Sequence, residues 1–132
     1  MSIVEGRELT KTYRTGEVAI TALNDVTIAI DRGEFAALAG PSGSGKTTLL
    51  NMLGGLDMPD AGTVVVEGSN LQSMSSTRRA ELRLRRVGFV FQSYNLIPVL
   101  SALENVEFVM LLQGVPAEER RKRAAAILDE VG

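Results

Sequence analysis

A glycine-rich stretch at residues 36–50 constrains the fold of this chain more than any other feature. Four residues stand at the fixed positions of the pattern G-x-x-x-x-G-K-[ST]: Gly40, Gly45, Lys46 and Thr47. The apolar run at 35–39 predicts a buried strand before the pattern, and the leucines within 47–56 recur at helical spacing. A strand, a glycine-rich turn and a helix in this order form the context in which the pattern binds phosphate.

The chemistry of these residue types explains that expectation. Glycine adopts positive φ without strain, so successive N–H groups can converge on an anion. The helix that follows adds a partial positive charge at its N-terminus. Lys46 can reach the outer phosphates, and the Thr47 hydroxyl can bind Mg²⁺. The alternative is a glycine- and serine-rich turn that binds nothing, and the flanking elements argue against it.

Composition limits the remaining possibilities. The chain has 132 residues, enough for one domain with a sizeable core. Its net charge of −2 does not favour binding to nucleic acid or to an anionic membrane. The sequence contains no Cys and no His, so disulfides, thiolate zinc sites and histidine general bases are excluded within it. No apolar run is long enough to span a bilayer, and we expect a cytoplasmic polypeptide.

The residues before the glycine-rich stretch predict antiparallel strands. Residues 3–13 form one candidate strand, and residues 18–30 another, with a turn at 14–17 between them. A β-branched run at 63–66 predicts a further strand after the first helix. Small GTPases and nucleotide kinases tend to place their phosphate loop directly after the first strand, so this order argues against both classes.

A basic helix is predicted at residues 77–86, with Ser76 or Thr77 as its N-cap. It carries five arginines against a single acidic residue, Glu81. A nucleic-acid patch is one interpretation, but no aromatic residues stand between the arginines. A solvated basic face is therefore favoured.

Two further helices are predicted near the C-terminal end. An apolar strand, buried on both faces, is expected first at 87–91, ending at Gln92. Ser101 and Glu104 then have the spacing of a capping box for a helix that ends at Gly114. Pro116 is expected at the first position of the last helix, which has Glu118 and Glu119 near its positive end.

Residues 125–130 allow two interpretations. An apolar run that ends in Asp129 could be a strand whose carboxylate holds Mg²⁺. The run continues a charged helical segment without a turn signal, however, and its alanines favour a helix. We therefore expect a helix here and assign no metal role to Asp129.

Together these stretches resemble the N-terminal part of an ABC-transporter ATP-binding domain. The chain is most similar to the subgroup of lipoprotein-releasing, macrolide-export and cell-division ATPases. The matching stretches are 9–13 (LTKTY), 22–26, 33–35, 40–50, 56–59 (LDMP), 87–92 (VGFVFQ), 94–98 (YNLIP), 102–106 and the final helix.

The resemblance implies an α/β fold, a P-loop NTPase core of the ABC ATPase type with an antiparallel N-terminal β-subdomain. That subdomain would comprise about 1–35 and 60–70, with the P-loop and its helix at 36–58. Residues 77–92 would form a helix and the Q-loop strand, and 93–132 a helical segment facing a membrane partner.

The resemblance also implies a site for ATP and Mg²⁺. Tyr13 would stack on adenine, and Gln92 would contact both Mg²⁺ and the attacking water. Lys46 and Gln92 would be catalytic, and Thr47 and Gln92 would bind the metal. The nucleotide-binding residues would be Tyr13, Gly40, Ser42, Gly43, Ser44, Gly45, Lys46, Thr47 and Thr48. Without the resemblance, Tyr13 could be a tyrosine that packs locally, and Gln92 a polar residue that ends a strand.

The implied partners are ATP or ADP, a membrane-spanning transporter subunit that contacts 93–115, and a second ATP-binding domain. Nucleic acid is not among them, and the protein would lie at the inner face of the membrane. The family's LSGGQ signature, Walker B strand and switch His do not occur in these residues. We therefore expect a chain truncated before those motifs, which binds ATP but does not hydrolyse it. The rival interpretations are a DNA-linked ABC ATPase and an inactive fragment of the fold.

Overall fold

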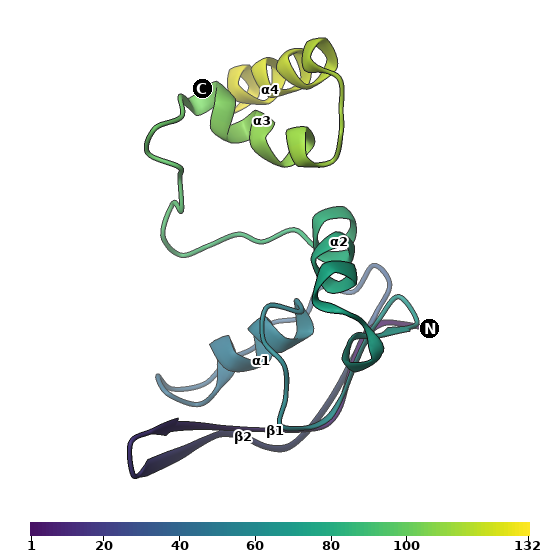
Figure 1. Cartoon of the computed structure of the whole chain (residues 1–132), viewed down its shortest axis with the longest axis vertical. Coiled ribbons are helices and arrows are strands. Elements are labelled where there is room, and N and C mark those ends of the chain that lie inside the picture. Colours follow the sequence, from purple (N-terminus) through teal and green to yellow (C-terminus); the bar gives the residue numbers. More distant parts are fainter. The chain divides into compact units, whose positions relative to one another are not determined.

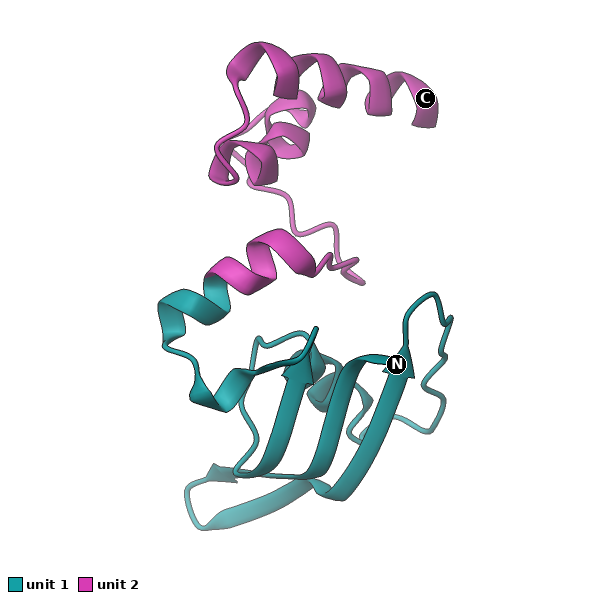
Figure 2. Ribbon diagram, turned by 90° about the vertical axis from the view of Figure 1, so that its right-hand side faces the viewer, with its two compact units in different colours: residues 1–80 teal, residues 81–132 magenta.

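The structure is a computed structural model that describes residues 1–132. The chain divides into two compact units, Met1–Ala80 and Glu81–Gly132, which Figure 2 shows in different colours. None of its helices combines the length and the apolar character that crossing a membrane requires.

The first unit is built on a four-stranded antiparallel sheet with the order β2-β1-β3-β4. Its strands are β1 (Ser2–Thr15), β2 (Val18–Asp31), β3 (Ala61–Val66) and β4 (Ser69–Asn70). The long hairpin of β1 and β2 is visible in Figure 1. This confirms the strands predicted before the glycine-rich stretch, each slightly longer than its sequence pattern indicated.

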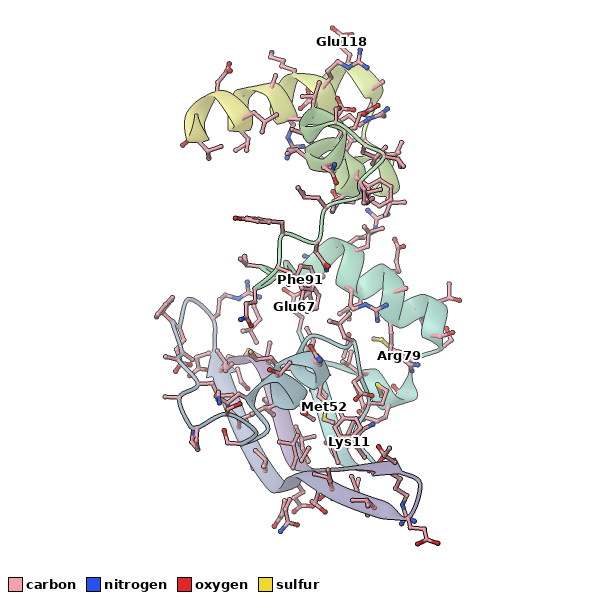
Figure 3. All side chains as sticks on the ribbon, turned by 90° about the vertical axis from the view of Figure 1, so that its left-hand side faces the viewer. Lys11, Met52, Glu67, Arg79, Phe91 and Glu118 are labelled. Atoms are coloured by element: carbon pink, nitrogen blue, oxygen red, sulfur yellow. The ribbon has the colours of Figure 1, made fainter.

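Helix α1 (Lys46–Leu53) packs against this sheet and forms the core of the unit. Its buried residues are Leu49, Met52 and Leu53, which lie on one helical face. Figure 3 shows Met52 on this helix. The sheet and the segment after it contribute Leu9, Leu23, Val64, Val66 and Leu71 to the same core.

The predicted extent of α1, to residue 56, was too long. The helix ends at Leu53 because two glycines follow it, and Gly55 adopts a φ of 70°. The Gly55 N–H donates to the Met52 carbonyl at 2.9 Å, and the Leu56 N–H donates to the Asn51 carbonyl at 2.7 Å. These bonds satisfy the last carbonyls of the helix and turn the chain away from its axis.

A single 3₁₀ turn, η1 (Leu71–Ser73), precedes α2 (Ser76–Arg86). The helix is where the sequence predicts it, but the cap is not Ser76 or Thr77. The Ser75 hydroxyl accepts the Arg78 N–H at 3.3 Å instead, because the helix begins one residue earlier than the pattern suggested.

The arginines of α2 make internal contacts. Within the first unit, the Arg79 guanidinium, labelled in Figure 3, donates to the carbonyls of Met74 and Leu71 at 2.6 and 3.5 Å. Within the second unit, Arg85 pairs with Glu81 one helical turn before it. At least these two arginines therefore have a structural role.

The second unit contains the helices α3 (Ala102–Leu112) and α4 (Ala117–Val131), which pack against each other in Figure 1. The capping box is confirmed: the Ser101 hydroxyl accepts the Glu104 N–H at 3.3 Å, and Glu104 accepts the Ser101 N–H at 2.8 Å. Glu107 of α3 is buried and lies 3.5 Å from Arg120 and 3.6 Å from Arg121 of α4. This pairing offsets part of the cost of burying a carboxylate.

Helix α4 settles the two interpretations of 125–130 in favour of a helix, since it continues through Asp129 to Val131. The sequence predicted Pro116 as the first helical residue of α4. In the structure Pro116 is the N-cap, one residue before the helix begins. The Pro116 ψ of 146° is extended, so the helical dihedrals begin only at Ala117.

Two predicted strands are absent. Residues 35–39 and 87–91 have no regular secondary structure, and Phe35 is 97 % exposed. A strand buried on both faces needs a hydrogen-bonded neighbour and covering layers, and neither segment pairs with the sheet. Both segments are apolar in sequence, but the prediction that they form buried strands was wrong for this chain. The finer division of the chain into four functional segments stays a prediction.

Candidate functional site

The phosphate loop, residues 40–48, runs into the N-terminus of α1 and lies against β2. Gly43 and Gly45 adopt φ angles of 80° and 87°. A Cβ at Gly45 would lie 2.3 Å from the Ala22 carbonyl oxygen of β2, so no other residue fits there without a shift. This close approach of two backbones fixes the loop beside the hairpin.

The Lys46 ammonium folds back over the loop. It donates hydrogen bonds to the carbonyls of Gly40 and Pro41, at 2.8 and 2.6 Å, and to the Ser44 hydroxyl at 3.2 Å. All three acceptors are neutral. A phosphate oxygen carries negative charge and would therefore form stronger hydrogen bonds with the Lys46 ammonium. The loop therefore holds a cation where an anion could bind.

The start of α1 adds to this positive character. Gly45 is the N-cap and provides no side-chain hydrogen bond, and the first turn contains no acidic residue. The helix N-terminus thus presents its N–H groups and dipole without a carboxylate nearby on the helix. This is the arrangement expected of an anion-binding helix start.

A hollow of about 550 Å³ lies between the phosphate loop and the hairpin, and we call it the loop–hairpin hollow. Its hairpin side consists of Tyr13, Ile20, Thr21 and Ala22. Its other side consists of residues of the loop and α1: Ser42, Gly43, Gly45, Lys46, Thr47 and Thr48. The structure therefore brings Tyr13 together with six of the predicted phosphate-binding residues.

The other two predicted phosphate-binding residues, Gly40 and Ser44, line a smaller neighbouring hollow of about 310 Å³ that shares Gly45 and Lys46. Sequence reasoning missed Ile20, Thr21 and Ala22. Their placement follows from the pairing of Tyr13 with Ile20 across the hairpin, a register that only the folded strands define. No Asp or Glu lines either hollow.

Tyr13 both lines this hollow and makes local contacts. Its hydroxyl donates to Asp57 Oδ2 at 2.9 Å, and the Lys11 ammonium lies 5.4 Å from its ring centroid. Tyr13 as a whole remains 42 % exposed. Lys11 and Asp57 were not predicted as site residues, although both belong to stretches that carry the family resemblance.

The Asp57 carboxylate is ionised at neutral pH. Partial burial opposes its ionisation, but hydrogen bonds from Lys11, the Met58 N–H and Tyr13 outweigh this effect and lower the pKa of Asp57. Because the folded pKa lies below its ordinary value, the stabilisation is present at neutral pH. It is lost only as the pH falls through that lowered pKa.

Gln92 lies in the second unit, exposed, in the irregular segment after α2. It is not among the residues that line either hollow. Its predicted contacts with Mg²⁺ and with an attacking water stay a prediction.

Comparison with known families identifies the chain. The model of the family described as "ABC transporter" matches residues 23–132. The chain belongs to the ABC transporter family. The match includes the phosphate loop, α1 and the whole of the second unit, so the family resemblance inferred from the sequence is confirmed.

Individual members of the ABC transporter family are similar along almost the whole chain. An uncharacterized ABC transporter ATP-binding protein of Thermotoga maritima is 49 % identical over 98 % of this chain and 56 % of its own length. The macrolide export ATP-binding/permease protein MacB of Brucella abortus is 46 % identical over 96 % of this chain and 20 % of its own length. The chain thus spans little more than half of the Thermotoga relative and a fifth of MacB.

Solved ABC cassettes have the same fold. The structure of the ATP-binding cassette MJ0796, described as a dimeric post-hydrolysis state bound to ADP and Pi, superposes with a TM-score of 0.89 at 43 % identity. The match covers 96 % of this chain and 56 % of that one. The predicted fold class, an α/β ABC ATPase fold with an antiparallel N-terminal sheet, is confirmed.

The packing of Gly45 against β2 can be tested with a matched pair of variants. Both Gly43 and Gly45 have positive φ, but a Cβ at Gly43 would meet nothing within 4 Å. Gly43→Ala should cost only the left-handed backbone penalty of about 1–2 kcal/mol. Gly45→Ala adds a clash with a backbone carbonyl, which should lower the free energy of unfolding by about 1–3 kcal/mol more. Urea denaturation measures both, and equal losses would contradict the close packing.

Proposed function

We propose that this chain binds MgATP and MgADP in the loop–hairpin hollow, with the phosphates on residues 40–48 and adenine on the Tyr13 ring. One observation carries the proposal: the Tyr13 ring and the phosphate loop line the same hollow. Its volume of about 550 Å³ lies within the usual range for small-molecule sites, ~300–1,000 Å³. An aromatic side chain and a candidate anion site in one hollow match the base and the phosphates of a nucleotide.

The residues of the loop fit ATP and Mg²⁺ chemically. Lys46 supplies a positive charge for the outer phosphates, and the N–H groups at the start of α1 supply further donors. Thr47 lines the hollow, and its hydroxyl is an oxygen ligand of the kind that Mg²⁺ prefers. Gln92 would complete the metal site. Bound Mg²⁺ would neutralise charge that develops on the phosphates.

We further propose that the ATP-binding fold of this chain serves a motor that couples ATP hydrolysis to transport across a membrane. MacB combines an ATP-binding region with a permease, and MJ0796 is described as a dimeric cassette. Residues 93–115 would contact a membrane-spanning subunit, and exposed apolar side chains at Tyr94, Leu96 and Val99 support a contact there. A second ATP-binding domain would be the other partner, at the inner face of the membrane.

We further propose that these 132 residues bind ATP without hydrolysing it. Hydrolysis needs a held metal and an oriented water beside the γ-phosphate. The residues that line the two hollows include no carboxylate that could do either. Asp129, which the sequence analysis considered as a metal ligand, lies on α4 together with its neighbour Glu130.

Lys46→Ala should weaken MgATP binding at least tenfold, since charge-assisted hydrogen bonds contribute about 1.5–3 kcal/mol each. Isothermal titration calorimetry of the purified chain measures the affinity. Lys122→Ala is the matched control, because it removes the same charge from α4 of the other unit. Equal affinities for the wild type and Lys46→Ala would contradict phosphate binding at this loop.

Tyr13→Ala should weaken MgATP binding by about 1–3 kcal/mol, the range for stacking of a base on an aromatic ring. Tyr13→Phe and Tyr13→Trp should bind MgATP more tightly than Tyr13→Ala, because an aromatic ring remains. Tyr94→Ala, at a tyrosine that is 94 % exposed, should change nothing. If the affinity of Tyr13→Ala matches the wild type at the same salt concentration, adenine does not lie on this ring.

Steady-state phosphate release should show no Lys46-dependent turnover, because the site lacks a carboxylate for the metal or the water. The assay uses highly purified protein, with Lys46→Ala as the control for contaminating ATPases. Turnover near 1 s⁻¹, at the lower end of common enzyme rates, that disappears in Lys46→Ala would contradict binding without hydrolysis.

A further inference from the structure

The segment after α1 holds strand β1 through two carboxylates. Asp57 Oδ1 accepts the Lys11 ammonium at 3.1 Å, and Asp57 Oδ2 accepts the Tyr13 hydroxyl at 2.9 Å. Asp60 Oδ2 accepts the Thr12 N–H at 2.7 Å. Both carboxylates contact Lys11, since Asp60 Oδ1 lies 3.9 Å from its ammonium, but only Asp57 binds the Tyr13 hydroxyl and only Asp60 accepts a backbone N–H of the strand.

The Tyr13 ring has little else to fix its orientation. Every residue from 13 to 20 at the end of the hairpin is exposed, so no core packing surrounds the ring. A tyrosine side chain rotates about two torsions, and a hydrogen bond at its far end restricts both. The Lys11 ammonium also lies near the ring, and Asp57 and the Met58 carbonyl hold that ammonium at 3.1 and 2.7 Å.

Asp57 is itself tied to the helix that begins at the phosphate loop. Its N–H donates to the Asn51 carbonyl of α1 at 3.2 Å, and the Leu56 N–H donates to the same carbonyl. The helix has eight residues, a length of about 12 Å at the usual rise. The fully buried Met52 anchors it on the sheet. One short, packed helix therefore joins Lys46 to the carboxylate that holds Tyr13.

We infer that Asp57 is a positioning residue for nucleotide binding, which holds the Tyr13 ring at a fixed place relative to the phosphate loop. The inference rests on the proposed function, because the ring has to stack on a base. It assigns no contact with the nucleotide to Asp57. Through Asp57, the Tyr13 ring and the phosphate loop are both attached to α1. Less conformational entropy of the Tyr13 side chain is therefore lost when the nucleotide binds.

The test compares MgATP with magnesium tripolyphosphate, which has phosphates but no base. Asp57→Ala should lower the affinity for MgATP about threefold to tenfold, the factor expected for the loss of one hydrogen bond. Its affinity for tripolyphosphate should stay within about twofold of the wild type. In a Tyr13→Phe background, which has already lost the phenol bond, Asp57→Ala should lower the MgATP affinity by less than about twofold.

The matched control is Asp60→Asn, which keeps an acceptor for the Thr12 N–H and an oxygen near Lys11, and which leaves the bonds of Asp57 to Lys11 and Tyr13 in place. It should bind both ligands like the wild type. If Asp57→Ala does not fold, Tyr13→Phe alone carries the test, with a MgATP affinity about twofold to fivefold below the wild type. Equal affinity of Tyr13→Phe and the wild type would then overturn the inference.

Three results for a folded Asp57→Ala would overturn it: an unchanged MgATP affinity, an equal loss for tripolyphosphate, or an undiminished effect in the Tyr13→Phe background. The Tyr13→Ala variant shows whether only the positioning role of Asp57 is wrong or the proposed stacking of adenine on Tyr13 is wrong as well. If Tyr13→Ala weakens MgATP binding while Asp57→Ala does not, stacking stands and positioning by Asp57 is wrong. If Tyr13→Ala has no effect, both are wrong.

Discussion

The contact between Gly45 and the Ala22 carbonyl of β2 is the constraint on which the candidate nucleotide site depends. A backbone can come this close to another backbone only where no Cβ intervenes, and the φ of 87° at Gly45 adds a second reason for glycine. Once this contact forms, the phosphate loop lies beside the hairpin that carries Tyr13. The buried face of α1 then holds the loop in place from its other side. The residues that line the loop–hairpin hollow can remain exposed because neighbouring core residues define their backbone.

The second unit is held together differently. Its helices begin at local signals, the capping box at Ser101 and the N-cap Pro116, and they meet through the buried Glu107 and two arginines of α4. Such buried ion pairs contribute little net stability, because the cost of desolvating the charges offsets much of their attraction. This helical pair matches the same family model as the phosphate loop.

Local signals in the sequence were enough for much of the fold. The phosphate loop, the hairpin and the capping box each depend on residues close together in the chain, and all three were predicted. The end of α1 and the cap of α2 were missed by a few residues, because glycine pairs and neighbouring serines compete at such boundaries. The strands expected at 35–39 and 87–91 failed for a different reason. Their apolar sequence describes a buried environment, and only pairing with other strands creates one.

The lining of the loop–hairpin hollow could be predicted from the sequence only in part. Tyr13 and the loop residues carry their chemistry in short motifs, whereas Ile20 and Thr21 enter the hollow through strand register. Asp57 reaches Tyr13 across 44 residues of sequence, and no local pattern encodes that contact. Long-range hydrogen bonds of this kind need the folded structure to become visible.

Amide hydrogen exchange with and without MgADP tests the central claim most directly, since it reports where on the chain the ligand is held. The account predicts slower exchange at residues 43–48 in the presence of MgADP. It predicts no comparable change on α3 or α4, which contribute nothing to the loop–hairpin hollow. Unchanged exchange at 43–48, or protection confined to the second unit, would contradict the account.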